Sequence, residues 1–162
     1  MQVTVEAVAF EDKGVLRRLV QLYLHDMSEF TGADADAHGE FGYRYLDQYW
    51  APDAGEERHP LFVRADGALA GFAMVRRVAD EWQMAEFFIM RRFRRERIGS
   101  FAAEVVFRRF PGRWSVHQLP ANLPAQAFWP RVIRAVARGE IEEGREDDGA
   151  TWQRFTSPGR DA

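Results

Sequence analysis

AEFFIMRRFRRERIGS, residues 85–100, contains three successive patterns that together decide the fold. The apolar run through Ile89 predicts a strand, the five arginines after it predict a basic loop, and the spacing from Ile98 onward predicts a helix. The first turn of a helix carries unpaired N–H groups and a positive dipole end, so it attracts anions, and Gly99 lets a ligand approach the backbone closely. The stretch therefore predicts a site for a phosphorylated ligand. A solvated basic turn beside an ordinary helix start is the alternative that these residues leave open.

The flanking sequence predicts a mixed α/β (α+β) domain. Alternating patterns predict strands over 2–9, 60–65, 69–78, 82–90, 114–119, 141–145 and 151–155, and helical spacing predicts helices over 11–30, 40–50, 98–110 and 122–137. Asp66-Gly67 predicts a hairpin turn, and only the strand–helix–strand unit from Trp82 to Leu119 requires a parallel crossover. We therefore expect one domain over 1–157 with a frayed tail at 158–162. Its sheet should have six to seven mostly antiparallel strands, with four helices on its two faces.

Composition excludes several classes of function. The 162 residues carry 22 Lys+Arg against 25 Asp+Glu, a net charge of −3, which argues against a general nucleic-acid coat. The absence of cysteine excludes disulfides, thiolate zinc sites and a cysteine nucleophile, and four scattered histidines do not predict a metal site. No apolar run approaches the roughly 18 residues that span a bilayer, and the N-terminus has no signal-peptide pattern. We expect a cytoplasmic protein that binds no metal, membrane or nucleic acid.

Two motifs resemble those of the GNAT N-acetyltransferase superfamily. Residues 94–99 (RRERIG) resemble the family's Arg/Gln-x-x-Gly-x-Gly/Ala motif, and residues 122–129 (NLPAQAFW) resemble its Asn-x-x-Ala-x-x-Phe-Tyr helix. The expected order of elements also fits this fold over essentially the whole chain. The resemblance implies a GNAT-like fold, acetyl-CoA as co-substrate, and a small-molecule or peptide amine as acceptor.

The resemblance also implies which residues contact acetyl-CoA. Main-chain groups of the strand pair with the pantetheine arm, N–H groups from the loop and the helix start wrap the pyrophosphate, and the second motif adds one polar and one aromatic contact. The implied set is Phe87, Phe88, Ile89, Arg94, Arg95, Glu96, Arg97, Ile98, Gly99, Ser100, Asn122 and Phe128.

The sequence departs from the family pattern at two positions. Arg97 stands where the family usually has its first glycine, and its side chain either crowds the cofactor or pairs with a phosphate; we favour the pairing. Trp129 stands where many members have the tyrosine that protonates the leaving thiolate. Either another group supplies that proton or the thiolate leaves unprotonated, which its moderate pKa allows.

Glu86 and His117 are the candidate catalytic residues. Glu86 lies among apolar residues, which raise a carboxyl pKa toward the range of a general base, and similar acetyltransferases use a glutamate on this strand. His117 lies near the end of the strand that follows the cofactor helix and has a suitable unperturbed pKa. An outward-facing or ion-paired Glu86, and a surface His117, are the structural alternatives. The resemblance implies that a backbone N–H near Phe88 or Ile89 stabilises the oxyanion.

The acidic and aromatic segment from Tyr23 to Trp50 is the candidate binding region for a cationic acceptor. The residues predicted to bind the acceptor are Tyr23, Asp26, Glu29 and Tyr43. The alternative is that the aromatic residues are core and the acids form a solvated face. Exposed aromatics at 41–50 are also compatible with a homodimer.

The sequence therefore predicts an acyltransferase that moves acetyl from acetyl-CoA to an amine in a ternary complex. Two alternatives stay open: a non-catalytic acyl-CoA sensor of the same fold, and a nucleic-acid or phospho-ligand binding module that uses the Arg91–Arg97 loop with Phe93 as a stacking platform. The acceptor itself is not specified by the sequence.

Overall fold

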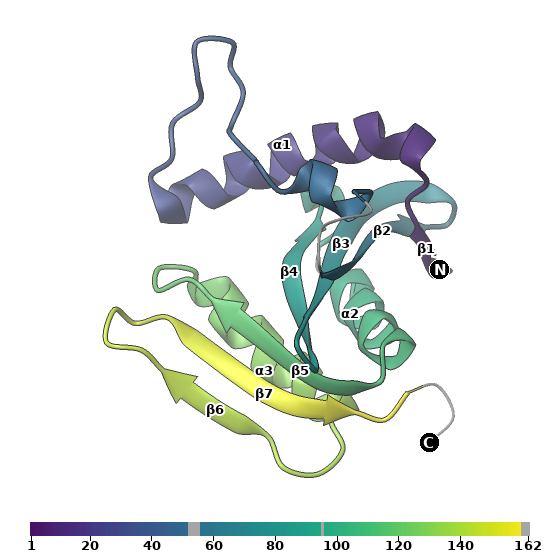
Figure 1. Cartoon of the computed structure of the whole chain (residues 1–162), viewed down its shortest axis with the longest axis vertical. Coiled ribbons are helices and arrows are strands. Elements are labelled where there is room, and N and C mark those ends of the chain that lie inside the picture. The colour runs from purple at the N-terminus through teal and green to yellow at the C-terminus, as the bar shows by residue number, and fades with distance from the viewer. Residues whose placement is uncertain (52–55, 95, 160–162) are drawn as a thin grey trace.

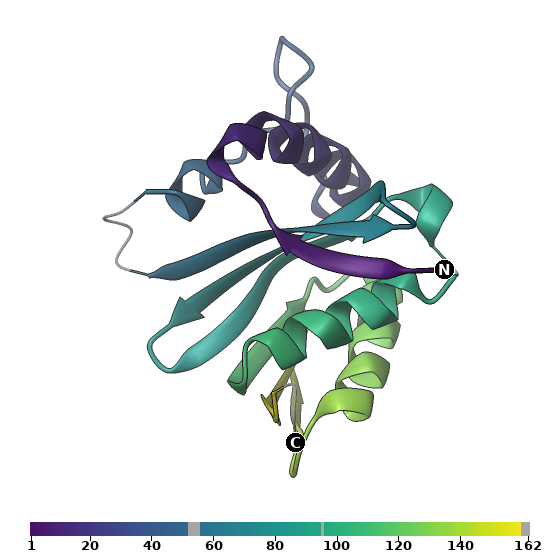
Figure 2. The same ribbon diagram turned by 90° about the vertical axis from the view of Figure 1, so that its right-hand side faces the viewer.

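The computed structural model describes residues 1–51, 56–94 and 96–159 as a seven-stranded sheet with helices on both faces (Figures 1 and 2). The strand order is β1-β2-β3-β4-β5-β7-β6. The strands are β1 (Val3–Ala7), β2 (Glu57–Ala65), β3 (Ala68–Val78), β4 (Glu81–Ile89), β5 (Gly112–Gln118), β6 (Glu142–Arg145) and β7 (Thr151–Ser157). The helices are α1 (Lys13–Thr31), α2 (Ile98–Arg109) and α3 (Leu123–Val136), with short 3-10 turns η1 (Phe10–Asp12), η2 (Leu46–Tyr49) and η3 (Arg91–Phe93).

The predicted fold class and topology are confirmed. Asp66 and Gly67 form the β2–β3 hairpin with φ of 47° and 80°, as a two-residue turn of this type requires. β4 and β5 are parallel and joined through α2, whereas the other neighbouring strands are antiparallel.

The predicted helix over residues 40–50 is wrong, so the described residues contain three α-helices instead of four. Only η2 forms there. The segment contains Gly42 and several aromatic residues, all weaker helix formers than alanine or leucine. It is held to α1 instead, because the Gln21 side chain donates to the Phe41 carbonyl at 2.8 Å and accepts from its N–H at 2.7 Å.

Two buried clusters fix the layers. Figure 2 shows α1 on one face of the sheet and α2 and α3 on the other. Leu16 and Val20 of α1 pack with Phe72 on the first face, and the larger cluster around Trp114 and Phe107 joins the sheet to α2 and α3. Phe101 of α2 lies outside both clusters and is 49 % exposed. No helix in the described ranges combines the length and hydropathy needed to cross a membrane.

The close approach of β4 to Gly71 allows a test of the β3–β4 register. A Cβ at this position would lie 1.9 Å from the Phe88 carbonyl oxygen, so Gly71→Ala should lower the free energy of unfolding by about 3 kcal/mol or more. The matched control is Gly14→Ala in α1, where a Cβ meets nothing within 4 Å, and this change should stabilise by about 0.5–1 kcal/mol. Urea unfolding of both variants measures the difference, and equal midpoints would contradict the register.

Candidate active site

Glu86 reaches the α1 face of the sheet because β4 contains one unpaired residue. In the β3–β4 ladder Met74 pairs with Glu86 and Val75 pairs with Met84, which leaves Ala85 without a partner. A bulge of one residue reverses the face toward which the following side chains point. Met84 therefore packs in the core beneath α2 and α3, whereas the Glu86 carboxylate contacts α1.

Two tyrosines hold the Glu86 carboxylate. Tyr23 of α1 donates to Oε2 at 2.5 Å, and Tyr43 donates to Oε1 at 3.4 Å. Burial raises the pKa of Glu86; the two phenol hydrogen bonds and the charge of Arg76 lower it, and the pKa remains above its ordinary value. A carboxylate with a raised pKa suits proton abstraction better than an ordinary glutamate does.

His117 lies on the same face of the sheet as Glu86 but is exposed. Trp114 and Val116 of β5 point into the core beneath α3, so His117 points to the opposite face, and it is paired across the ladder with Trp152. Gln118, its neighbour, is buried on the α3 side and exchanges amide hydrogen bonds with Gln153.

The predicted acceptor-binding residues fall into two groups. Tyr23 and Tyr43 meet at the Glu86 carboxylate, on the sheet face below α1. Asp26 lies one turn further along α1 and is already ion-paired, and Glu29 is exposed.

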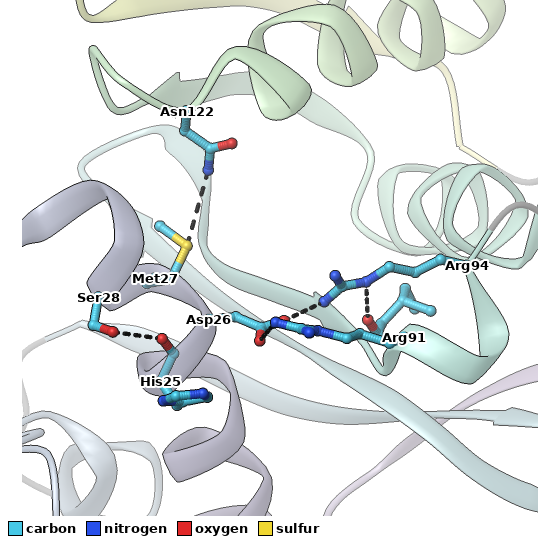
Figure 3. A network of polar contacts seen from close by, with 8 residues as sticks. His25, Asp26, Met27, Ser28, Arg91, Arg94 and Asn122 are labelled. Carbon is cyan, nitrogen blue, oxygen red and sulfur yellow. Dashed lines mark hydrogen bonds and ion pairs between the residues drawn. The ribbon is translucent and has the colours of Figure 1, made fainter.

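Asp26 joins α1 to the arginine-rich loop after β4 (Figure 3). Arg91 donates to Oδ1 at 2.9 Å and Arg94 to Oδ2 at 2.5 Å, while Arg94 Nε also donates to the Ile89 carbonyl at 2.8 Å. Burial alone would raise the pKa of Asp26, but the hydrogen bonds and charges of the two arginines lower it below its ordinary value. The loop that follows β4 is thus held in place by a carboxylate of α1.

β4 and β5 separate after a short parallel ladder. Their pairing covers only Glu81–Gln83 against Arg113–Ser115, although β4 continues to Ile89 and β5 to Gln118 (Figure 1). The β5-facing edge of β4 from Met84 to Ile89, which includes the predicted Phe87 and Phe88, therefore has no ladder partner in the described sheet. Such an edge can pair with an extended amide-containing chain as an added strand.

The start of α2 has the features of an anion site. The N–H groups of Ile98, Gly99 and Ser100 have no backbone partner within the described residues, as expected for a first helical turn. Arg97, the N-cap, has φ of 62°, a left-handed conformation that explains why a glycine is usual here in the resembling motif. Glu96 is exposed. Arg95 lies outside the described residues.

Gly99 lies where β4, α2 and α3 converge. A Cβ at this position would be 3.5 Å from the Ile89 side chain and 3.6 Å from the ring of Phe128. Phe128 stacks with Phe87 at 6.1 Å between ring centres.

Asn122 caps α3, and Trp129 lies in the core. The Asn122 side chain accepts from the Ala125 N–H at 3.1 Å and approaches the Met27 sulfur at 3.9 Å across the opening between α1 and α3 (Figure 3). Trp129 is 7 % exposed and packs edge-to-face on Phe87 at 5.1 Å, so it fills space where a tyrosine would offer a proton.

Sequence reasoning missed Arg58 and included Tyr49 only as one aromatic residue of the 23–50 segment; both lie on the same sheet face as Glu86. The Arg58 guanidinium carbon lies 5.3 Å from the Tyr49 ring centre, and both side chains are buried. The register places Arg58 opposite Arg76. The alternation of Arg58, Pro60 and Phe62 was the available signal, because Phe62 is an obvious core residue and Arg58 must share its face.

Within the described ranges, no cluster of three or more His, Asp or Glu side chains forms a metal site.

The family comparison covers most of the chain. A sequence model described as the acetyltransferase (GNAT) family matches residues 16–132. Among curated proteins, no sequence matches significantly.

Solved structures share the fold at low sequence identity. An acetyltransferase from Thermus thermophilus superposes with a TM-score of 0.71 at 13 % identity, covering 96 % of this chain and 97 % of that one. The ribosomal-protein-S18-alanine N-acetyltransferase from Escherichia coli gives 0.60 at 13 % identity over 99 % and 97 %. The PaiA N-acetyltransferase from Thermoplasma acidophilum, in complex with coenzyme A, gives 0.61 at 10 % identity over 96 % and 99 %. These likenesses show the fold.

Arg97 provides a test of the strained helix start. A left-handed conformation costs an L-residue roughly 1–2 kcal/mol, so Arg97→Gly should raise the stability by about 1 kcal/mol and the Tm by about 2–4 °C. Arg92→Gly removes the same charge from the exposed turn η3 and serves as the matched control, with no gain expected. Calorimetry compares the two, and a Tm of Arg97→Gly at or below wild type would contradict the assigned backbone strain.

Proposed function

Because the chain belongs to the GNAT acetyltransferase family, we propose that it transfers an acetyl group from acetyl-CoA to a primary amine in a ternary complex. One observation carries the proposal: the Glu86 carboxylate, held by Tyr23, lies directly after the bulge where β4 and β5 have separated. A base and an open strand edge therefore adjoin each other at one position of the sheet.

The residues around the point where β4 and β5 separate fit acetyl-CoA. The edge of β4 at Phe87, Phe88 and Ile89 offers main-chain groups to the pantetheine amides, with Asn122 and Phe128 on the facing helix. The N–H groups at the start of α2 face the pyrophosphate, and Arg94 and Arg97 lie beside them. A relative of this fold was solved with coenzyme A, which is consistent with this assignment.

Glu86 acts as the general base in this proposal. Acetyl-CoA supplies a thioester: the amine nitrogen bonds to its carbonyl carbon and loses its second proton to solvent, while the carbon–sulfur bond breaks and the sulfur leaves as a thiolate. Glu86 accepts a proton from the acceptor ammonium, directly or through one water, while Tyr23 and Tyr43 fix the carboxylate. An amide N–H near Phe88 or Ile89 stabilises the carbonyl oxygen as it becomes negative.

The leaving thiolate needs no dedicated acid in this proposal. Trp129 carries no acidic proton, and a thiol has an unperturbed pKa of about 8.5, so a thiolate is a tolerable leaving group at neutral pH. His117 faces the same side of the sheet as Glu86 and is a second candidate for proton transfer.

The ion pairs of the basic loop favour acyl transfer over nucleic-acid binding. Arg91 and Arg94 already share the Asp26 carboxylate, which lowers the charge that the loop offers to an extended phosphate backbone. The raised pKa of Glu86 in turn favours an active enzyme over a non-catalytic sensor.

Acetyl-CoA binding is tested by thermal shift. Acetyl-CoA at one hundred times its Kd should stabilise the chain by about 2.7 kcal/mol, and Gly99→Leu should abolish most of that shift, because the added side chain fills the space between Ile89 and Phe128. Gly14→Leu, at an open position of α1, is the matched control and should keep the full shift. No shift for the wild-type chain at millimolar acetyl-CoA would refute the proposed co-substrate.

The base is tested with Glu86→Gln. We expect kcat to fall by about 10²–10⁴-fold with unchanged affinity for acetyl-CoA. In the wild type, kcat/KM should rise with pH through the raised pKa of Glu86 and then level, because only the ionised form accepts a proton; the variant should lack this acid limb.

The contribution of Glu86 to stability should depend on pH in the opposite direction to its contribution to activity. A raised carboxyl pKa means that the stability it supports is complete below the ordinary pKa and declines as pH rises through the raised one. Glu86→Gln should therefore have an equal or higher Tm than wild type at pH 7. Unchanged turnover in a well-folded variant would remove Glu86 as the base.

A further inference from the structure

Tyr49 and Arg58 are two buried side chains, and each has one polar atom without a hydrogen-bond partner in the described part of the chain. Tyr49 is 5 % exposed and the Arg58 side chain 6 %. Neither the Tyr49 hydroxyl nor Arg58 Nε has a hydrogen-bond partner among the described residues. A buried polar atom without a partner costs about 1–3 kcal/mol, so two such atoms side by side require a reason.

Both atoms lie on the face of the sheet that carries Glu86. Arg58 stands two residues before Pro60, and Pro60 pairs with Met74, which in turn pairs with Glu86. The Tyr49 and Arg58 groups are close together, since the guanidinium carbon lies 5.3 Å from the tyrosine ring centre. Strands are about 4.8 Å apart and rise about 3.3 Å per residue, so Glu86 lies two strands across and two residues along from Arg58, about 12 Å away between Cα atoms.

The missing partner must be a hydrogen-bond acceptor. Arg58 Nε can only donate, and a phenol next to a guanidinium donates more favourably than it accepts. Burial raises the pKa of Tyr49, the charge of Arg58 and its approach to the hydroxyl lower it, Glu86 raises it and Arg76 lowers it. The resulting value of about 12 keeps the hydroxyl protonated at neutral pH. Two donors and a fixed positive charge thus lie side by side on the Glu86 face of the sheet, and neither donor has an acceptor among the described residues.

The surrounding charges favour an anionic oxygen. Arg58 donates to Glu56 at 2.7 Å through its NH2 group, and Arg76 lies 3.8 Å from the same carboxylate. One glutamate therefore serves two guanidinium groups, which leaves positive charge on this side of the site. Arg76 is also the more solvent-accessible of the two arginines, 34 % exposed against 6 %.

The geometry points to a subsite for the acceptor: Tyr49 and Arg58 bind a carboxylate of the same molecule whose amine is presented to Glu86. The acceptor class is therefore an amino-carboxylate, such as an amino acid, and this assignment rests on the proposed acetyl transfer. The ammonium lies toward Glu86 and the carboxylate toward Arg58, so that each charged end meets its complement.

Matched acceptors test the assignment. Acetylation rates are measured for three pairs that differ only in a carboxylate: lysine and cadaverine, tyrosine and tyramine, tryptophan and tryptamine. At least one amino acid should exceed its decarboxylated partner by tenfold or more in kcat/KM. Phosphoethanolamine against ethanolamine distinguishes a phosphate from a carboxylate, and a preference for the phosphate alone overturns the carboxylate assignment.

Variants identify the residues. Tyr49→Phe removes only the hydroxyl and should raise KM for the preferred amino acid about tenfold, with kcat and the KM for acetyl-CoA unchanged. Its Tm should stay equal or rise, because an unsatisfied buried group is removed. Arg58→Lys keeps the charge but loses Nε and should give a similar rise. Arg77→Gln is the matched control: Arg77 Nε is also buried without a partner among the described residues, but Arg77 follows Arg76 on β3 and packs on Trp82 at the face away from Glu86.

Two results overturn the inference while leaving the proposed function standing. One is an absence of preference in all three pairs, whether both members react equally or neither reacts, in a chain that acetyl-CoA stabilises. The other is an unchanged KM in Tyr49→Phe. Failure of acetyl-CoA to stabilise the chain is a separate outcome, and it removes the proposed function together with the inference.

Discussion

The site depends on how β4 divides its pairing between two neighbours. It is bonded to β3 along its length, but to β5 for only three residue pairs. The unpaired Ala85 adds a second constraint, because it turns the strand after Met84 and sends the next carboxylate to the α1 face. One irregular strand thereby produces an open main-chain edge and places the Glu86 carboxylate on the adjacent face. Gly71 makes this possible, since only a residue without a Cβ tolerates the Phe88 carbonyl so close.

Ion pairs connect α1 to the loop after β4, in addition to the packing of both on the sheet. Asp26 of α1 holds Arg91 and Arg94, and these arginines flank the loop that leads to the unpaired amides of α2. A helix that contributes Tyr23 to the base therefore also positions the loop expected to bind phosphate. Asp26 is 18 % exposed, but Arg91 and Arg94 are 73 % and 43 % exposed, so the contact positions the loop mainly because one carboxylate holds two arginines.

Much of the fold could be predicted from the sequence, because hairpin residues and alternating strands are local signals. The segment at 40–50 could not, since its conformation depends on the Gln21 side chain and not on its own periodicity. The face occupied by Glu86 could not be predicted either. Regular alternation would have placed it with Trp82 and Met84 beneath α2, and a bulge has no reliable sequence signature. The motif predicted the loop at 94–99, but the left-handed conformation of Arg97 could be seen only in the structure.

The electrostatics of the site explain why its polar groups are not all satisfied internally. Burial pushes Glu86 toward its neutral form, and the phenols of Tyr23 and Tyr43 restore enough stabilisation to keep it usable as a base. A carboxylate fully neutralised by arginine would be too weak a base, so Arg58 and Arg76 are tied to Glu56 instead. Their remaining donors are then available to a ligand that brings its own negative charge. The proposed acceptor carries both charges, so its carboxylate would meet these donors without neutralising Glu86.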